Sequence, residues 1–130
     1  MKVILLGAVV AAVAAAGTVV ALWPHDQEAN DYSVTTAQHT VALTVENPRT
    51  GTNTLEFDVA NRDGSPVTAD TLTVDIVMPT MGHAAPPIIA TNTDPGHYRA
   101  RDATFSMSGS WEVTVRLPDD DLAVFSVPVR

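Results

Sequence analysis

The sequence predicts an all-β fold, an immunoglobulin-like β-sandwich of about seven strands, preceded by one amino-terminal transmembrane or signal helix. Three observations lead to this expectation. An uncharged apolar run fills residues 3–23, apolar and polar residues alternate with a period of two through most of the later chain, and turn-forming residues separate the alternating segments. A chain of 130 residues that is 45% hydrophobic can form one packed domain.

The first predicted element is the apolar run itself, which follows Lys2 and contains no charged residue. A helix over residues 3–23 would span roughly 30 Å, the thickness of a bilayer core. The run is longer than the apolar part of a secretory signal peptide, yet the small residues at 14–16 and 19–21 suit a signal peptidase. An uncleaved membrane anchor and a cleaved signal both remain open, and both place the rest of the chain outside the cytoplasm.

The remainder of the chain divides into a polar tether over residues 24–37 and a β-sandwich domain over residues 38–130. Within the domain, alternation predicts which side chains face the core. These inward-facing residues are Val41, Leu43 and Val45; Leu55, Phe57 and Val59; Leu72, Val74 and Ile76; and Trp111, Val113, Val115 and Leu117. A turn at Asp94–Gly96 leads into another predicted strand, and a last strand closes the chain.

Composition and motifs exclude several classes of function. The sequence has no cysteine, so disulfides, thiolate metal sites and thiol nucleophiles are ruled out. The net charge of −8 argues against a nucleic-acid partner, because binding phosphates requires basic patches. No signature of a hydrolase, metalloprotease or nucleotide-binding enzyme is present, and we expect the protein not to be an enzyme.

The candidate site comes from the stretch MPTMGHAAPP at residues 78–87 and the stretch FSMSGSW at residues 105–111. Neighbouring strands of a sandwich would bring these two stretches together. The candidate metal ligands are Met78, Met81, His83 and Met107. Three thioethers and one imidazole suit Cu(I), a soft ion that accepts methionine sulfur, better than Zn(II) or Ca(II).

Three of the candidate ligands also have a simpler interpretation, whereas a purely packing role is less natural for Met81, which lies in a loop beside Gly82 and His83. Met78 continues an inward-facing series and would fill the end of the core, and Met107 would pack against Trp111. His83 would be an ordinary exposed loop histidine, whereas His97, next to a tyrosine, is a weaker candidate for an additional ligand.

Two other groups of polar residues are expected to lie in solvent. His25 and His39 fall in or near the tether, and the acidic run 119–121 follows a proline as a solvated turn rather than as a calcium site.

The same stretches carry a resemblance to a known family. The sequences MPTMGHAAPP and PGHYRARDATFSMSGSWEVTVRL resemble the YtkA-like family, which is related to the periplasmic part of FixH-type proteins. The matching positions are Met78, Pro79, Met81, Gly82 and His83; Gly96 and Tyr98; and Phe105, Met107, Gly109 and Trp111. The resemblance implies a small membrane-attached β-sandwich of the bacterial envelope, linked to copper handling or to assembly of haem-copper oxidases. FixH-type proteins usually carry further segments that this chain lacks.

Together these features predict a membrane-tethered extracytoplasmic protein that binds Cu(I) and holds or delivers copper in the bacterial envelope. Its partners would be the membrane, through the amino-terminal helix, and an envelope copper acceptor or oxidase subunit. The alternative is a metal-free interaction module that assists assembly of a membrane complex such as a haem-copper oxidase.

Overall fold

The computed structural model describes residues 30–130. The predicted amino-terminal helix at residues 1–23 and the first part of the tether lie outside the described residues. Among residues 30–130, no helix has the length and apolar character needed to cross a membrane. The elements are β1 (Asp31–Thr35), β2 (His39–Val45), β3 (Gly51–Asn61), β4 (Thr71–Met78), the 3₁₀ helix η2 (Pro79–Met81), β5 (His83–Ala84), β6 (Ile88–Asp94), β7 (His97–Phe105), β8 (Gly109–Leu117) and β9 (Asp121–Val129).

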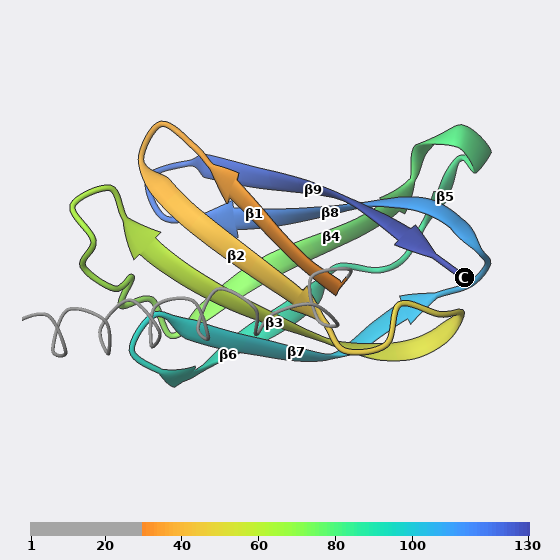
Figure 1. The fold of residues 1–130 in the computed structure, drawn as a ribbon, viewed down its shortest axis with the longest axis horizontal. Helices are drawn as coiled ribbons and strands as arrows, with labels where there is room; N and C mark the ends of the chain where they lie inside the picture. The colour runs from red at the N-terminus through yellow and green to blue at the C-terminus, as the bar shows by residue number, and fades with distance from the viewer. Residues whose placement is uncertain (1–29) are drawn as a thin grey trace, which may run out of the picture.

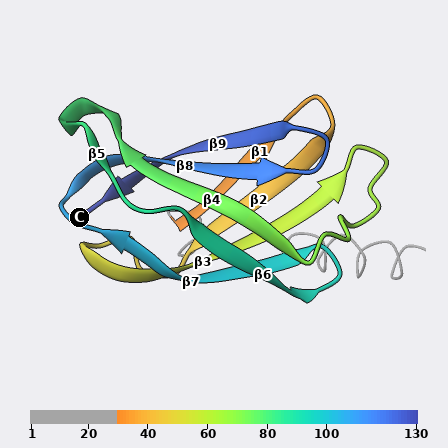
Figure 2. The same cartoon turned by 180° about the vertical axis from the view of Figure 1, so that it is seen from behind.

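All pairings in the described part of the chain are antiparallel and belong to one sheet. The strand order is β1-β2-β3-β7-β6-β4-β8-β9, and β5 pairs separately with β4. The two end strands, β1 and β9, come into contact without pairing, so the sheet is a nearly closed barrel (Figures 1 and 2).

The all-β prediction is confirmed, but the architecture differs from the expected two-layer immunoglobulin-like sandwich of about seven strands. Residues 30–130 instead form a single nearly closed sheet of nine strands. Pairing shifts register between Asn53 and Leu55 in β3 and between Asn92 and Asp94 in β6. Such irregularities increase the local bend and twist of a strand, which helps a sheet to curl on itself.

Part of the segment expected to be a tether is a strand. β1 pairs with β2 from Asp31↔Thr44 to Thr35↔Thr40. Its side chains alternate between exposed and partly buried, and Tyr32 and Val34 pack against the core. Two apolar residues in a polar sequence are a weak signal, because an end strand needs only one half-buried face.

The core lies inside the barrel and consists mainly of aliphatic side chains. Every residue predicted to face inward is buried, as the pattern of alternation required. The inward-facing aromatic residues are Phe57, Tyr98, Phe105, Trp111 and Phe125.

A partly buried polar cluster joins the β1–β2 turn and the start of β2 to β9, and we call it the His39–Asp121 latch. His39 is only 1% exposed, and its Nδ1 lies 2.8 Å from Asp121 Oδ2. Because a carboxylate only accepts hydrogen bonds, the ring nitrogen is the donor. The Thr36 hydroxyl donates to the same oxygen. The expectation that His39 faces solvent was therefore wrong, because the near-closure of the barrel places the β1–β2 turn beside the start of β9.

The acidic run is a turn, but its last residue is not simply solvated. Asp119 and Asp120 are exposed and have φ angles of 63° and 57°, as a tight hairpin turn requires. Burial by itself raises the pKa of Asp121, but hydrogen bonds from Thr36 and His39 and the charge of His39 outweigh it, so the pKa lies below its ordinary value. The latch therefore favours an ionised Asp121.

Candidate metal-binding site

The first half of the candidate site is the reversal between β4 and β5. Pro79 ends the pairing of β4, and η2 follows over Pro79–Met81. Gly82 closes this turn with φ of 66°, a left-handed conformation that favours glycine, and its N–H donates to the carbonyl oxygen of Pro79. The chain then returns beside β4, so that Met78 and His83 become direct pairing partners. The M-P-x-M-G-H stretch is thus a turn that brings its last residue back to its first.

This pairing places Met78 and His83 on the same face of the sheet. Side chains directly opposite each other in an antiparallel pair have Cβ atoms roughly 5 Å apart. Met78 is 1% exposed and belongs to the core, whereas His83 is exposed at the rim. One thioether therefore lies at the inner end of this pair, and one imidazole lies at its solvent side.

The second half of the site is the turn between β7 and β8, which two aromatic residues hold in place. The rings of Phe105 and Trp111 meet edge to face, with centroids 5.6 Å apart and planes at 62°. Trp111 Nε1 donates a hydrogen bond of 3.0 Å to the carbonyl oxygen of Met107. Met107 is partly buried and packs against the core. The aromatic residues of the F-x-M-x-G-x-W stretch thus fix the backbone that carries Met107.

Gly109 is the point where the two halves touch. Its φ is 140°, and a Cβ at this position would lie 2.7 Å from Met78 Cε and 3.7 Å from Met78 Sδ. The end of the Met78 side chain therefore occupies the space that a larger residue at position 109 would fill. Because Gly109 follows Met107 by two residues, Met78 contacts the β7–β8 turn and also pairs with His83.

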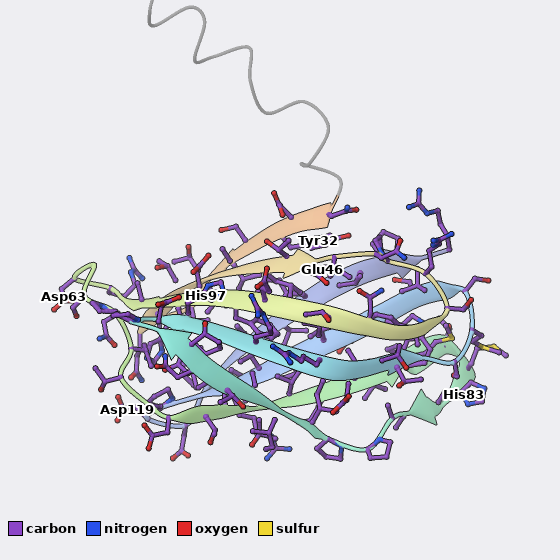
Figure 3. All side chains as sticks on the ribbon, turned by 90° about the horizontal axis from the view of Figure 1, so that it is seen from below. Tyr32, Glu46, Asp63, His83, His97 and Asp119 are labelled. Atoms are coloured by element: carbon purple, nitrogen blue, oxygen red, sulfur yellow. The ribbon has the colours of Figure 1, made fainter. Side chains whose placement is uncertain are left out.

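Met81 differs from the other candidate residues because its side chain faces solvent. It is 59% exposed on η2, next to the Met78–His83 pair along the chain. Figure 3 draws sulfur atoms at the end of the molecule where His83 is labelled. The structure therefore gathers Met78, His83 and the Met107 turn at one end of the barrel, while Met81 projects outward from the same reversal.

The chemistry of this set is unusual within the described part of the chain. No group of three or more His, Cys, Asp or Glu side chains suitable for a metal occurs among residues 30–130. The candidate set is of another kind, because three of its four donors are thioethers. Neutral sulfur donors of this type suit a soft monovalent ion.

His83 also differs from the two other histidines in the described residues. The ring of His39 bonds to Asp121, and His97 has Nδ1 2.7 Å from Asp58 Oδ1 and Nε2 3.5 Å from Glu56 Oε1. Within residues 30–130 the His83 ring makes no hydrogen bond or ion pair. Both nitrogens of His83 are thus available to a ligand, whereas those of His97 already face carboxylates.

The His97 network lies on the outer face of β3 and β7, away from the candidate site (Figure 3). The hydrogen bond to Asp58 raises the pKa of His97, and the nearby carboxylates of Asp58 and Glu56 add to this effect against the opposing influence of burial. Arg99 donates from Nε and Nη2 to Glu56 Oε1, which lowers the pKa of Glu56. His97 is therefore part of a surface ion network and does not lie with the candidate methionine ligands.

Two sequence features had a role that the sequence alone did not reveal. Gly109 and Trp111 were recognised as parts of a motif, but the contact of Gly109 with Met78 and the hydrogen bond from Trp111 to Met107 depend on strand pairing. The neighbouring register pair Val77↔Glu112 between β4 and β8 brings these segments together.

The fold and this site define a small all-β domain whose thioether-bearing turns meet at one end of a nearly closed barrel. The chain belongs to the YtkA-like family, which it matches over residues 26–116. That range contains the whole candidate site, and the family resemblance drawn from the motifs is confirmed. No curated protein matches the sequence.

Proposed function

We propose that this protein is a membrane-tethered extracytoplasmic Cu(I)-binding protein that holds or delivers copper in the bacterial envelope. The proposed ligands are Met78, Met81, His83 and Met107. The observation that carries the proposal is the position of Met78, which pairs with His83 on one side and contacts the turn of Met107 through Gly109 on the other. Two segments distant in sequence thus present soft donors at one end of the domain.

The donor set favours Cu(I) on chemical grounds. Thioethers are soft, neutral ligands, and imidazole is a good ligand for copper in either oxidation state. Zn(II) is usually held by thiolate, imidazole and carboxylate, and Ca(II) needs several oxygens. The absence of cysteine from the sequence means that the site does not depend on thiols, which form disulfides in oxidising compartments.

The proposed ligands would have different roles. Met78, buried beneath the rim, would be the innermost donor, and Met107 would be held by the hydrogen bond from Trp111 to its backbone. Met81 and His83 are exposed and would close the site from the solvent side. A partner would take the ion by first replacing these exposed ligands, Met81 and His83, before the ion leaves Met78 and Met107.

The location outside the cytoplasm rests on the uncharged run at residues 3–23 preceded by Lys2. The test is protease digestion of intact spheroplasts carrying the full chain with a carboxyl-terminal tag. Loss of the tag without lysis is the expected result, and protection of the tag until the membrane is broken would contradict the proposed orientation.

The copper proposal is tested by anaerobic titration of Cu(I) against a competing chelator, using the full chain in detergent. Replacing both outer ligands with M81A/H83A is expected to weaken Cu(I) binding by at least about a hundredfold. A matched control is I89A/H97A, which removes another exposed apolar side chain and another histidine outside the site. An unchanged affinity in M81A/H83A, or an equal loss in the control, would reject the assigned site.

One observation favours the alternative function, a metal-free interaction module. Met81 is the most exposed of the large hydrophobic residues in the described chain, and flexible methionine side chains adapt to partner surfaces. In that case the reversal containing Met81 and His83 would contact a membrane complex such as a haem-copper oxidase. Partner binding that is equal with and without copper, and is lost in M81A/H83A, would support this alternative.

A further inference from the structure

We propose that Met81 is an oxidation site through which peroxide lowers the copper affinity of the protein. This inference rests on the proposed function, because it concerns the regulation of the same site. It starts from an unequal exposure of the three methionines in residues 30–130. Met81 is 59% exposed, Met78 is 1% exposed, and Met107 is partly buried.

Exposure controls which thioether a dissolved oxidant reaches first. Methionine is oxidised in proteins according to its accessibility, and the chain has no cysteine thiol that would react in its place. Met78 lies inside the core with its methyl group against Gly109, so peroxide reaches it only when this end of the barrel opens. Met81 lies on η2 in solvent and needs no opening.

The reaction transfers one oxygen atom from hydrogen peroxide to the Met81 sulfur. The O–O bond breaks, an S–O bond forms, the sulfur loses two electrons, and the remaining oxygen leaves as water after taking up the second hydrogen. The product is methionine sulfoxide. One of the two sulfur lone pairs is now bonded to oxygen, and the remaining pair is a weaker donor because the sulfur has been oxidised. The sulfoxide oxygen is a harder donor that suits Cu(I) poorly.

The position of Met81 allows this change to act on the site without disrupting the fold. A sulfoxide at Met81 stays hydrated, so no polar group enters the core. A sulfoxide at Met78 would be buried without a hydrogen-bond partner and would destabilise the barrel. Exposure also leaves the Met81 sulfoxide accessible to a methionine sulfoxide reductase, which makes the change reversible.

The first test measures the site of oxidation and does not depend on copper. The copper-free full chain in detergent is treated with hydrogen peroxide, digested and followed by peptide mass spectrometry. We expect Met81 to gain an oxygen at least about tenfold faster than Met78 or Met107, and M81L to lose this rapid step. Equal rates for the three residues, or faster oxidation of Met78, would overturn the proposal.

The second test measures the consequence for copper. After removal of peroxide, Cu(I) affinity is expected to fall at least about tenfold in the wild-type protein and to return after treatment with a methionine sulfoxide reductase. The affinity of M81L, which lacks the thioether in both states, should not respond to peroxide. If oxidised wild-type protein keeps its affinity, the regulatory proposal fails and the copper function stands. If unoxidised protein binds no Cu(I), both fail, although the selective oxidation of Met81 would still be measurable.

Discussion

Two histidines near opposite ends of the barrel show how different the surroundings of one residue type can be. His39 lies in the His39–Asp121 latch, is 1% exposed and bonds to a carboxylate. His83 lies at the other end, is exposed and has no side-chain partner within residues 30–130 (Figure 3, where Asp119 marks the end with the latch). The first histidine contributes to closing the sheet, whereas the second is free to bind a ligand.

The local structure around each histidine explains the difference. The latch forms where the β1–β2 turn meets the first residue of β9, so the side chains of Thr36 and His39 both donate hydrogen bonds to Asp121. His83 lies on β5, a two-residue strand that pairs only with the end of β4. Few neighbours reach it, and its ring therefore remains available.

The largest effect on stability should follow from breaking the latch. Asp121→Ala removes the acceptor for His39 and Thr36 and leaves a buried ring nitrogen without a partner. We expect the free energy of unfolding to fall by about 2–3 kcal/mol, measured by urea denaturation. The control is Asp75→Ala, which breaks the ion pair with the well-exposed Arg116 and should cost at most about 1 kcal/mol. Equal losses of unfolding free energy in the two variants would show that the latch stabilises the fold no more than an exposed ion pair does.

The next prediction concerns the thioether end. Gly109→Ala introduces a Cβ 2.7 Å from Met78 Cε at a φ of 140° and should lower the free energy of unfolding by about 1–3 kcal/mol. Gly51→Ala is the matched control, because its φ of 107° is also strained but no atom lies within 4 Å of the added Cβ. Both variants should be less stable, but only Gly109→Ala should also weaken Cu(I) binding by displacing Met78. A similar loss of Cu(I) binding in Gly51→Ala would contradict this geometry.

Acidification should weaken the latch in a smaller and more gradual way. The pKa of Asp121 lies below the ordinary value of 3.8, so the folded protein binds fewer protons than the unfolded chain near that pH. The stabilisation is complete above pH 3.8 and is lost as the pH falls towards the folded pKa. Urea denaturation at neutral and acidic pH should show a steeper acid loss for the wild-type protein than for Asp121→Asn. Parallel curves would exclude Asp121 as a source of the acid sensitivity.

The smallest effect should come from the exposed His97 network and should have the opposite sign. The pKa of His97 lies above its ordinary value of 6.5, mainly because of the hydrogen bond to Asp58. Its stabilisation is complete below pH 6.5 and is lost as the pH rises through the folded pKa. Because Asp58 is 72% exposed, we expect at most about 1 kcal/mol, and His97→Gln should remove this alkaline limb of the pH–stability curve. A limb that persists in His97→Gln would have to come from another group.

The sequence was most informative about strands and least informative about their partners. Alternation identified the buried faces of four strands, because a half-buried strand exposes every second residue. It did not identify β1, whose two apolar residues resemble a polar linker, and it could not distinguish two packed layers from one nearly closed sheet. The pairing of β1 and the near-closure of the sheet both depend on which strand edges meet, and this information is spread along the whole chain.

The candidate site shows the same division between local and long-range information. Local chemistry predicted the turn after Met78, since Pro79 ends a strand and Gly82 accepts a left-handed conformation. The pairing of Met78 with His83 follows from that turn. The contact of Met78 with Gly109 does not, because it depends on the register between β4 and β8.

The sequence by itself determined the all-β class, the family and the inward-facing residues, and it supplied the candidate soft donors, since these depend on residue type and short-range periodicity. Only the tertiary structure decided that the sheet nearly closes, that the buried His39 bonds to the partly exposed Asp121, and that Met81 is left open to solvent. The physical reason is that burial and hydrogen bonding depend on contacts between residues, and the contacts that matter here join segments far apart in the chain.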